Sequence, residues 1–84
     1  EWGPYPDGIK RDAKGNYWVG HYSAGQIAVL DPEGKLLGTL DVPSAAAPNL
    51  AFSADGKTVY VMAVDDTANA PYLGKVYAVA NPWP

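Results

Sequence analysis

Short apolar and β-branched runs, separated by turn-forming residues, dominate the pattern along this chain. The runs lie near 8–11, 16–21, 26–30, 36–42, 49–52, 58–64 and 74–80. Clusters of Gly, Asp, Asn and Pro separate them, as is typical of β-strands joined by tight turns. Helical spacing is hard to find anywhere, and the alanines at 45–47, between two prolines, are predicted to form a loop. The pattern therefore predicts an all-β fold.

The turns and strands recur at an interval of about forty residues, the signature of four-stranded β-propeller blades. Asp7 and Asn49 follow a proline at matching positions, and Trp18 matches Tyr60 in the second strand of each unit. We expect both of these aromatic residues in the core. The second unit shows no outer strand. We predict one two-blade unit over 1–84, with blade one at about 6–43, blade two at about 48–81, and Pro- and Trp-rich connecting ends at 1–5 and 82–84.

The second strand of the second unit, at 58–64, is apolar on both faces. A lone sheet would expose one of those faces, whereas a blade stacked between two neighbours buries both. The alternative is a single twisted all-β domain of the same strands. The propeller is favoured because the turn spacing repeats together with the apolar runs. Two blades cannot close a ring, and their open apolar faces favour assembly.

Composition is that of a folded domain, with 48% hydrophobic and 18% charged residues. The net charge of −3 comes from scattered acids without a basic patch, which argues against nucleic acid as a partner. No apolar run approaches the roughly 18 residues needed to cross a membrane, and no signal peptide is recognisable, so we expect a soluble chain. The lack of cysteine excludes disulfides and thiolate metal sites and leaves the compartment open.

Most polar residues have a structural interpretation. Asp12 and Asp55 are expected to bond backbone amides in turns. His21, the single histidine, is expected to be a polar residue at a strand edge, since no nucleophile accompanies it. The adjacent acids at 65–66 are expected to be solvated. The tryptophans near the ends, Trp2 and Trp83, are expected to pack at a junction between blades or subunits.

Four segments together resemble one known family. They are Pro6-Asp7-Gly8-Ile9, 12–19, 25–35 and 48–52, and with their order and spacing the resemblance covers nearly the whole chain. They are similar to the regucalcin/gluconolactonase (lactonase) family of six-bladed propellers, with other six-bladed propellers such as the NHL-repeat type as rivals.

The resemblance implies a divalent metal ion, often calcium, near the top of the central channel. It assigns Asp7 as a metal ligand and as the general base toward a lactone or ester. Asn49 holds the matching place in the next blade, so its amide oxygen is a second candidate ligand. The family's other ligands, a Glu of an early blade and an Asn of a middle blade, are missing from this sequence.

Two functions from different classes follow. The first is a structural propeller building block, a natural fragment or a designed unit, that assembles with copies of itself and has little or no catalysis of its own. Three copies would give six blades, so the predicted assembly is a homotrimer. The alternative is part of a divalent-metal-dependent lactonase or esterase. The missing ligands favour the first function for the isolated chain, and only a completed metal site would make it a lactone hydrolase.

Overall fold

A computed structural model describes residues 5–84 of the chain as seven β-strands. Residues 1–4, which include Trp2 and most of the predicted N-terminal connecting end, lie outside the described residues. The strands are β1 (Pro6–Arg11), β2 (Tyr17–His21), β3 (Gln26–Leu30), β4 (Leu36–Asp41), β5 (Ala46–Phe52), β6 (Thr58–Val64) and β7 (Gly74–Ala80). The all-β prediction is confirmed, and residues 5–84 contain no helix able to span a membrane.

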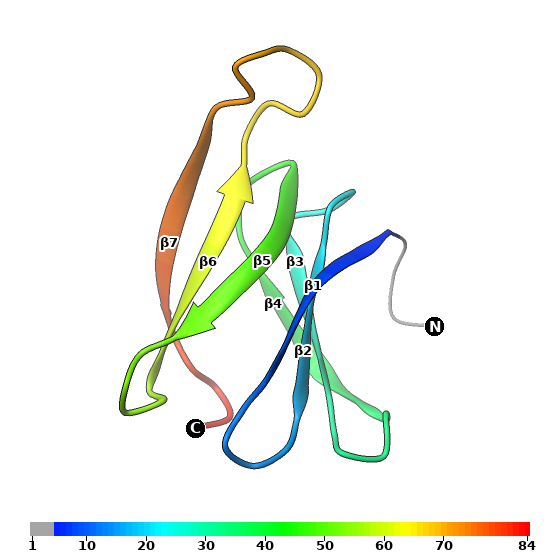
Figure 1. Ribbon diagram of the computed structural model, residues 1–84, viewed down its shortest axis with the longest axis vertical. Coiled ribbons are helices and arrows are strands. Elements are labelled where there is room, and N and C mark those ends of the chain that lie inside the picture. The colour runs from blue at the N-terminus through cyan, green and yellow to red at the C-terminus, as the bar shows by residue number, and fades with distance from the viewer. Residues whose placement is uncertain (1–4) are drawn as a thin grey trace.

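The strands form two antiparallel groups that lie side by side in Figure 1. In the first group β1 pairs with β2, β2 with β3, and β3 with β4. In the second group β5 pairs with β6, and β6 with β7, so residues 5–84 give this group three strands without an outer fourth, as predicted. A single pairing, between His21 of β2 and Ala47 of β5, joins the two groups. This arrangement is that of two successive propeller blades, each beginning with its innermost strand.

The junction between the two groups corrects two sequence-based expectations. Ala46 and Ala47, predicted in a loop, begin β5 and are fully buried. Gly20 of β2 lies directly against this part of β5, because a Cβ atom there would be 2.7 Å from the Ala47 carbonyl oxygen. His21 lies at the same junction and is fully buried, instead of occupying an exposed strand edge.

The core fills the space between the two groups of strands. Trp18 is fully buried at its centre and meets Phe52 of β5 edge to face, with ring centroids 5.1 Å apart. Trp83 meets Trp18 from the C-terminal segment at 5.9 Å, also edge to face. It covers Gly38 of β4, where a Cβ atom would lie 2.7 Å from the indole of Trp83. The expectation that Trp83 packs at a junction between blades is thus confirmed.

The prediction that Tyr60 is a core residue is wrong for this chain. Along β6 the side chains alternate, so Val59 and Val61 are fully buried while Tyr60 and Met62 remain 41% and 42% exposed. Val76 of β7, which pairs with Met62, is 67% exposed. These three residues form what we call the open face of blade two. The sequence repeat located the strand correctly, but residues 5–84 provide no further sheet to cover its second face.

The turn prediction for Asp12 and Asp55 is confirmed. Asp12 Oδ1 accepts hydrogen bonds from the backbone amides of Lys14 and Asn16, both at 2.9 Å. Asp55 Oδ1 accepts one from the backbone amide of Lys57 at 3.0 Å. Each carboxylate therefore closes the turn between the first and second strands of its blade.

Candidate functional site

The two predicted ligands lie on the innermost strands of the two blades, Asp7 on β1 and Asn49 on β5. Asp7 is exposed and Asn49 is half-buried. Gly8, next to Asp7, lies directly against β5: a Cβ atom there would be 2.7 Å from Asn49 Oδ1 and 2.8 Å from the Pro48 carbonyl oxygen. Glycine is thus the residue that permits this close approach. We call the residues Asp7, Gly8, Lys10 and Asn49 the β1–β5 edge.

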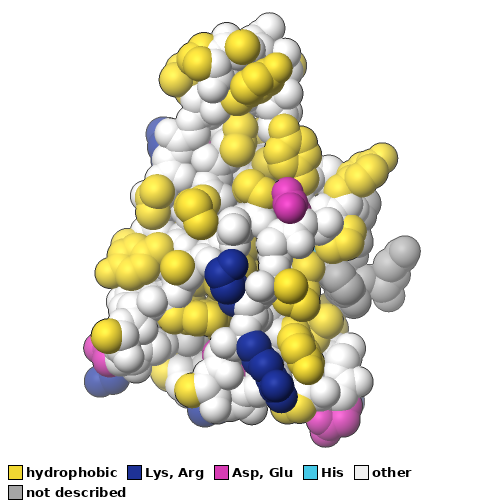
Figure 2. Space-filling model, in the orientation of Figure 1, with side chains coloured by type: hydrophobic (Ala, Val, Ile, Leu, Met, Phe, Trp, Pro, Cys, Tyr) yellow, Lys and Arg dark blue, Asp and Glu magenta, His cyan; other side chains and the backbone are white. Residues whose placement is uncertain are grey.

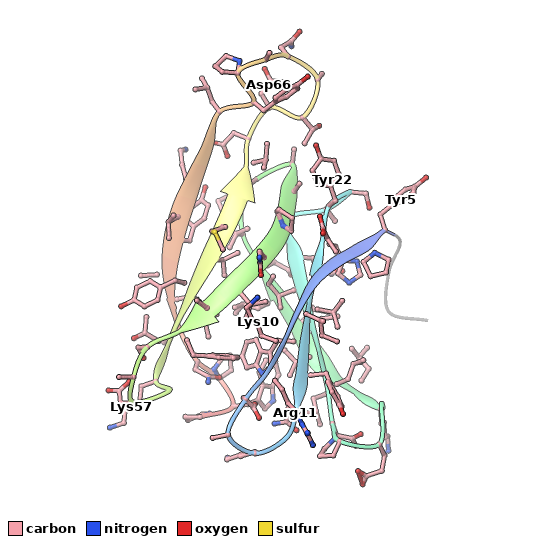
Figure 3. All side chains as sticks on the ribbon, viewed as in Figure 1. Tyr5, Lys10, Arg11, Tyr22, Lys57 and Asp66 are labelled. Carbon is pink, nitrogen blue, oxygen red and sulfur yellow. The ribbon has the colours of Figure 1, made fainter. Side chains whose placement is uncertain are left out.

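Lys10 is a member of this edge that the sequence did not indicate. Its Nζ atom donates a hydrogen bond of 3.1 Å to Asn49 Oδ1, so its side chain reaches from β1 toward β5 (Figure 3). The backbone amide of Leu50 donates to the same oxygen at 2.9 Å. A lysine three positions after an aspartate carries no motif, and only the relative placement of the two strands reveals the contact.

The adjacent cation, Arg11, is held away from Asn49. Its Nε atom donates to the Gly15 carbonyl oxygen at 3.4 Å, and its guanidinium lies over the Tyr17 ring, 5.3 Å from the centroid. Figure 2 shows basic side chains in the middle of this face, where Figure 3 labels Lys10 and Arg11. Lys10, and not Arg11, is therefore the basic residue that contacts Asn49.

The described residues do not by themselves make a metal site. A calcium ion takes about six to eight oxygen ligands, and residues 5–84 contain no group of three or more His, Cys, Asp or Glu side chains placed to hold an ion. An amide oxygen has two lone pairs, and Asn49 Oδ1 already accepts two hydrogen bonds, one of them from an ammonium group. Asp7 remains an accessible carboxylate. Asn49 could bind a cation only by releasing Lys10.

A second polar cluster links the two blades at the 42–45 connection, and sequence reasoning missed it. Ser44 Oγ donates to Asp65 Oδ1 at 2.5 Å and lies 3.2 Å from the Tyr77 hydroxyl oxygen. Lys75 Nζ is 3.5 Å from Asp65 Oδ2. The cluster ties the connection to the end of β6 and the start of β7. Asp65 therefore has direct structural partners, contrary to the expectation of a solvated acid.

Asp66 also differs from the expectation of a simply solvated acid. Its Oδ1 atom accepts hydrogen bonds from the backbone amides of Ala68 and Asn69, both at 3.0 Å. These bonds lower the pKa of Asp66 below its ordinary value. The carboxylate organises its own loop and lies apart from the β1–β5 edge, in the loop labelled in Figure 3.

No enclosed pocket forms within residues 5–84, and both Asp7 and Lys10 of the β1–β5 edge are exposed. The edge offers the Asp7 carboxylate and the Lys10 ammonium group on β1 and the Asn49 amide on β5. Such an edge can bind and orient a polar ligand, but the described residues do not surround it. Enclosure requires further blades.

The amino-acid sequence of this chain is similar to one protein family. The family model described as SMP-30/gluconolactonase/LRE-like region matches residues 1–65. The 6-deoxy-6-sulfogluconolactonase of Pseudomonas putida is 29% identical over 83 residues, which cover 90% of this chain and 28% of that protein. Regucalcin of Gallus gallus is 32% identical over 72 residues, which cover 83% of this chain and 24% of that protein.

A solved structure shows the same fold. A luciferin-regenerating enzyme, which is a propeller protein, superposes on this chain with a TM-score of 0.75 and 27% sequence identity. The superposition covers 96% of this chain and 29% of the enzyme chain. The chain thus spans between 24% and 29% of the length of these proteins. The match at 1–65 includes Asp7, Lys10 and Asn49. The chain belongs to the SMP-30/gluconolactonase/LRE-like family.

Proposed function

We propose that this chain supplies two adjacent blades of a lactone or ester hydrolase, with Asp7 as its general base. The observation that carries the proposal is the position of Asp7, an accessible carboxylate on an innermost strand beside the matching strand of the next blade. Family membership supports the reaction class. The name of the Pseudomonas putida relative describes a lactonase that acts on a sugar lactone, so we propose a sugar lactone as substrate class.

The chemistry needs a group that takes a proton from water. As water attacks the lactone carbonyl carbon, the Asp7 carboxylate accepts one of its protons. The bond between the carbonyl carbon and the ring oxygen then breaks, and the same proton returns to that oxygen, which leaves an open-chain hydroxy acid. An exposed carboxylate suits both transfers, because water and substrate can reach it.

The family is typically dependent on a divalent metal. We propose Asp7 as the oxygen ligand that these two blades bring to a calcium ion or another divalent cation. The other ligands would have to come from blades outside this chain, since the described residues lack them. For this reason we expect little or no hydrolysis by a single copy.

The test is hydrolysis of a gluconolactone by the chain in its largest purified assembly, with calcium and after chelation. The proposal predicts a calcium-dependent rate above buffer that disappears in Asp7→Ala. The matched control is Asp31→Ala, which removes a carboxylate from the turn between β3 and β4 and should leave the rate unchanged. A rate that persists in Asp7→Ala would contradict the role of Asp7. Absence of any rate in a ring-sized assembly would contradict hydrolysis by copies of this chain alone.

A second candidate function is favoured by the open face of blade two, formed by Tyr60, Met62 and Val76. Three large apolar side chains on one sheet face suit contact with another blade. On this proposal the chain is a structural building block that closes a ring with copies of itself, and three copies with two blades each would complete a six-bladed ring.

A further inference from the structure

The junction between the two blades of one chain shows how a blade contacts the next. Blade one contributes the face of its sheet that contains Trp18, which is fully buried and meets Phe52 of blade two. Blade two contributes the face that contains Leu50 and Val59, both fully buried as well. Side chains along a strand alternate between the two faces of a sheet. Each blade therefore uses one face in this junction and has a second face left over.

The second face of blade two corresponds to the face of blade one that contains Trp18. Tyr60 holds the position of Trp18, because each lies in the second strand of its blade, opposite a residue of the innermost strand, Ala51 and Lys10 respectively. Trp18 points toward the following blade and is fully buried. Tyr60 points away from blade one, where a following blade would lie, and is 41% exposed. The open face of blade two is thus the first half of a further junction.

The second face of blade one corresponds in turn to the face of blade two that contains Leu50. Leu50 lies opposite Val61, and Ile9 lies opposite Val19, the residue that matches Val61 in the repeat. Ile9 therefore holds the position of Leu50. Leu50 is fully buried in the junction, whereas Ile9 points away from blade two and is 58% exposed. Blade one thus carries the second half of a further junction.

Strand pairing adds three more residues to the face that contains Ile9. Arg11 lies two positions after Ile9 on β1, and its guanidinium lies over the ring of Tyr17, its pairing partner. Tyr17 is opposite Leu30, which is opposite Leu36, and paired residues of antiparallel strands share a face. Leu36 is 45% exposed. We call Ile9, Arg11, Tyr17 and Leu36 the outer face of blade one.

We propose that the open face of blade two binds the outer face of blade one of a second copy, in the arrangement that the two blades have within one chain. This inference rests on the building-block function, the second candidate above, and it names the surface that the partner copy contributes. Both halves of the contact belong to one chain, so copies join head to tail. A contact that reproduces the rotation from blade to blade closes into a ring and does not continue as a filament.

The correspondence also specifies what Tyr60 contacts. Within the chain Trp18 meets Phe52. Arg11 holds the position of Phe52, since each is paired with the residue directly before the matching aromatic residue of the second strand. Tyr60 of one copy therefore meets Arg11 of the next. A guanidinium group over a tyrosine ring is a favourable contact, so the charge of Arg11 is compatible with this interface.

The experiment measures the mass of two matched variants, alone and mixed, by sedimentation equilibrium up to millimolar concentration. Tyr60→Lys/Met62→Lys blocks the open face of blade two, and Ile9→Lys/Leu36→Lys blocks the outer face of blade one with the same added charge. All four side chains are at least 41% exposed in the single chain. Both variants should therefore keep the circular dichroism spectrum of the wild type.

We expect each variant alone to have the mass of one chain, and the equimolar mixture to form pairs of about twice 8.9 kDa. Such a pair contains one intact contact and two blocked faces, so nothing larger forms. The control is Ala54→Lys/Ala68→Lys, which adds the same charge at exposed positions in the two connections that flank β6. It should assemble as the wild type does.

The outcomes separate this inference from the function on which it rests. A mixture that stays at the mass of one chain, while the wild type assembles, would overturn the contact between the two faces. Self-assembly of the variant with the blocked outer face would also overturn it, because the open face would then bind a second open face. A wild type that stays at the mass of one chain at the same concentrations would overturn the building-block function itself.

Discussion

The indole Nε1 of Trp18 donates a hydrogen bond of 2.9 Å to Asp12 Oδ2. This bond connects the turn between β1 and β2 to the centre of the core, where Trp18 is fully buried. The other oxygen of Asp12 holds the turn amides of Lys14 and Asn16. The Asp12 carboxylate therefore holds both the turn and the Trp18 ring that packs between the two blades.

We expect Asp12→Ala to lower the free energy of unfolding by about 2 kcal/mol, because it leaves the indole N–H and two turn amides without their charged acceptor. Urea unfolding followed by tryptophan fluorescence measures the change. Asp31→Ala is the matched control. Asp31 also accepts two turn amides, from Glu33 and Lys35, and lies outside the Trp18 contact. A loss in Asp12→Ala no larger than in Asp31→Ala would show that the indole bond adds nothing.

The lowered pKa of Asp12 predicts how the stability of the fold depends on pH. Burial acts to raise the pKa of Asp12, but hydrogen bonds from Trp18, Asn16 and Lys14 outweigh it, and the pKa is lowered overall. The stability that Asp12 contributes is therefore complete above the unfolded pKa of about 3.9, and it is lost as the pH falls through the lower folded pKa.

The measurement is the urea midpoint of the wild type and of Asp12→Asn at pH 6 and again near pH 3. The wild type should lose more stability than the variant over this range, since an amide does not titrate. Asp55 and Asp66 remain in both proteins, and hydrogen bonds lower the pKa of each, so some acid sensitivity persists in the variant. An identical drop in both proteins would mean that Asp12 does not contribute to it.

The strands could be predicted because apolar runs and turn residues alternate at short, repeating intervals, and the turn roles of Asp12 and Asp55 follow from the same local signals. Contacts between strands distant in sequence could not be predicted. The Lys10–Asn49 bond spans 39 positions and depends on how β1 meets β5. The sequence repeat also predicts a buried Tyr60, which is wrong. In a complete ring a further blade would cover this face of β6, and residues 5–84 contain no such blade.

The close approach of Gly8 to β5 predicts that any larger residue there disturbs the β1–β5 edge. Gly8→Ala would place its Cβ atom 2.8 Å from the Pro48 carbonyl oxygen, which belongs to the backbone and cannot move freely. We expect a loss of about 1–3 kcal/mol in unfolding free energy, measured by urea unfolding. Ala54→Ser, which adds one heavy atom in an exposed turn, should change stability by less than about 0.5 kcal/mol. Similar small effects in both variants would argue against close contact.

The open face of blade two predicts a variant that folds but does not assemble. Tyr60→Lys/Met62→Lys places two charges where a neighbouring blade would need apolar contacts, and burial of unpaired charge is costly. Because both side chains are already 41–42% exposed in the single chain, its circular dichroism spectrum should be retained. Analytical ultracentrifugation should show smaller species than for the wild type. Ala54→Lys, which adds a charge in the turn at the end of the blade, should assemble normally. Wild-type assembly by the double variant would exclude this face as the contact.

The claim that these two blades function within a closed ring is tested most directly by the solution mass of the purified chain. Light scattering after size exclusion, at micromolar concentration and with and without calcium, gives this mass. We predict a mass of about three times the 8.9 kDa of one chain, the number that completes six blades. A stable single-chain mass under both conditions would contradict self-assembly, and the proposed roles of Asp7 would then require a longer protein that contains these blades.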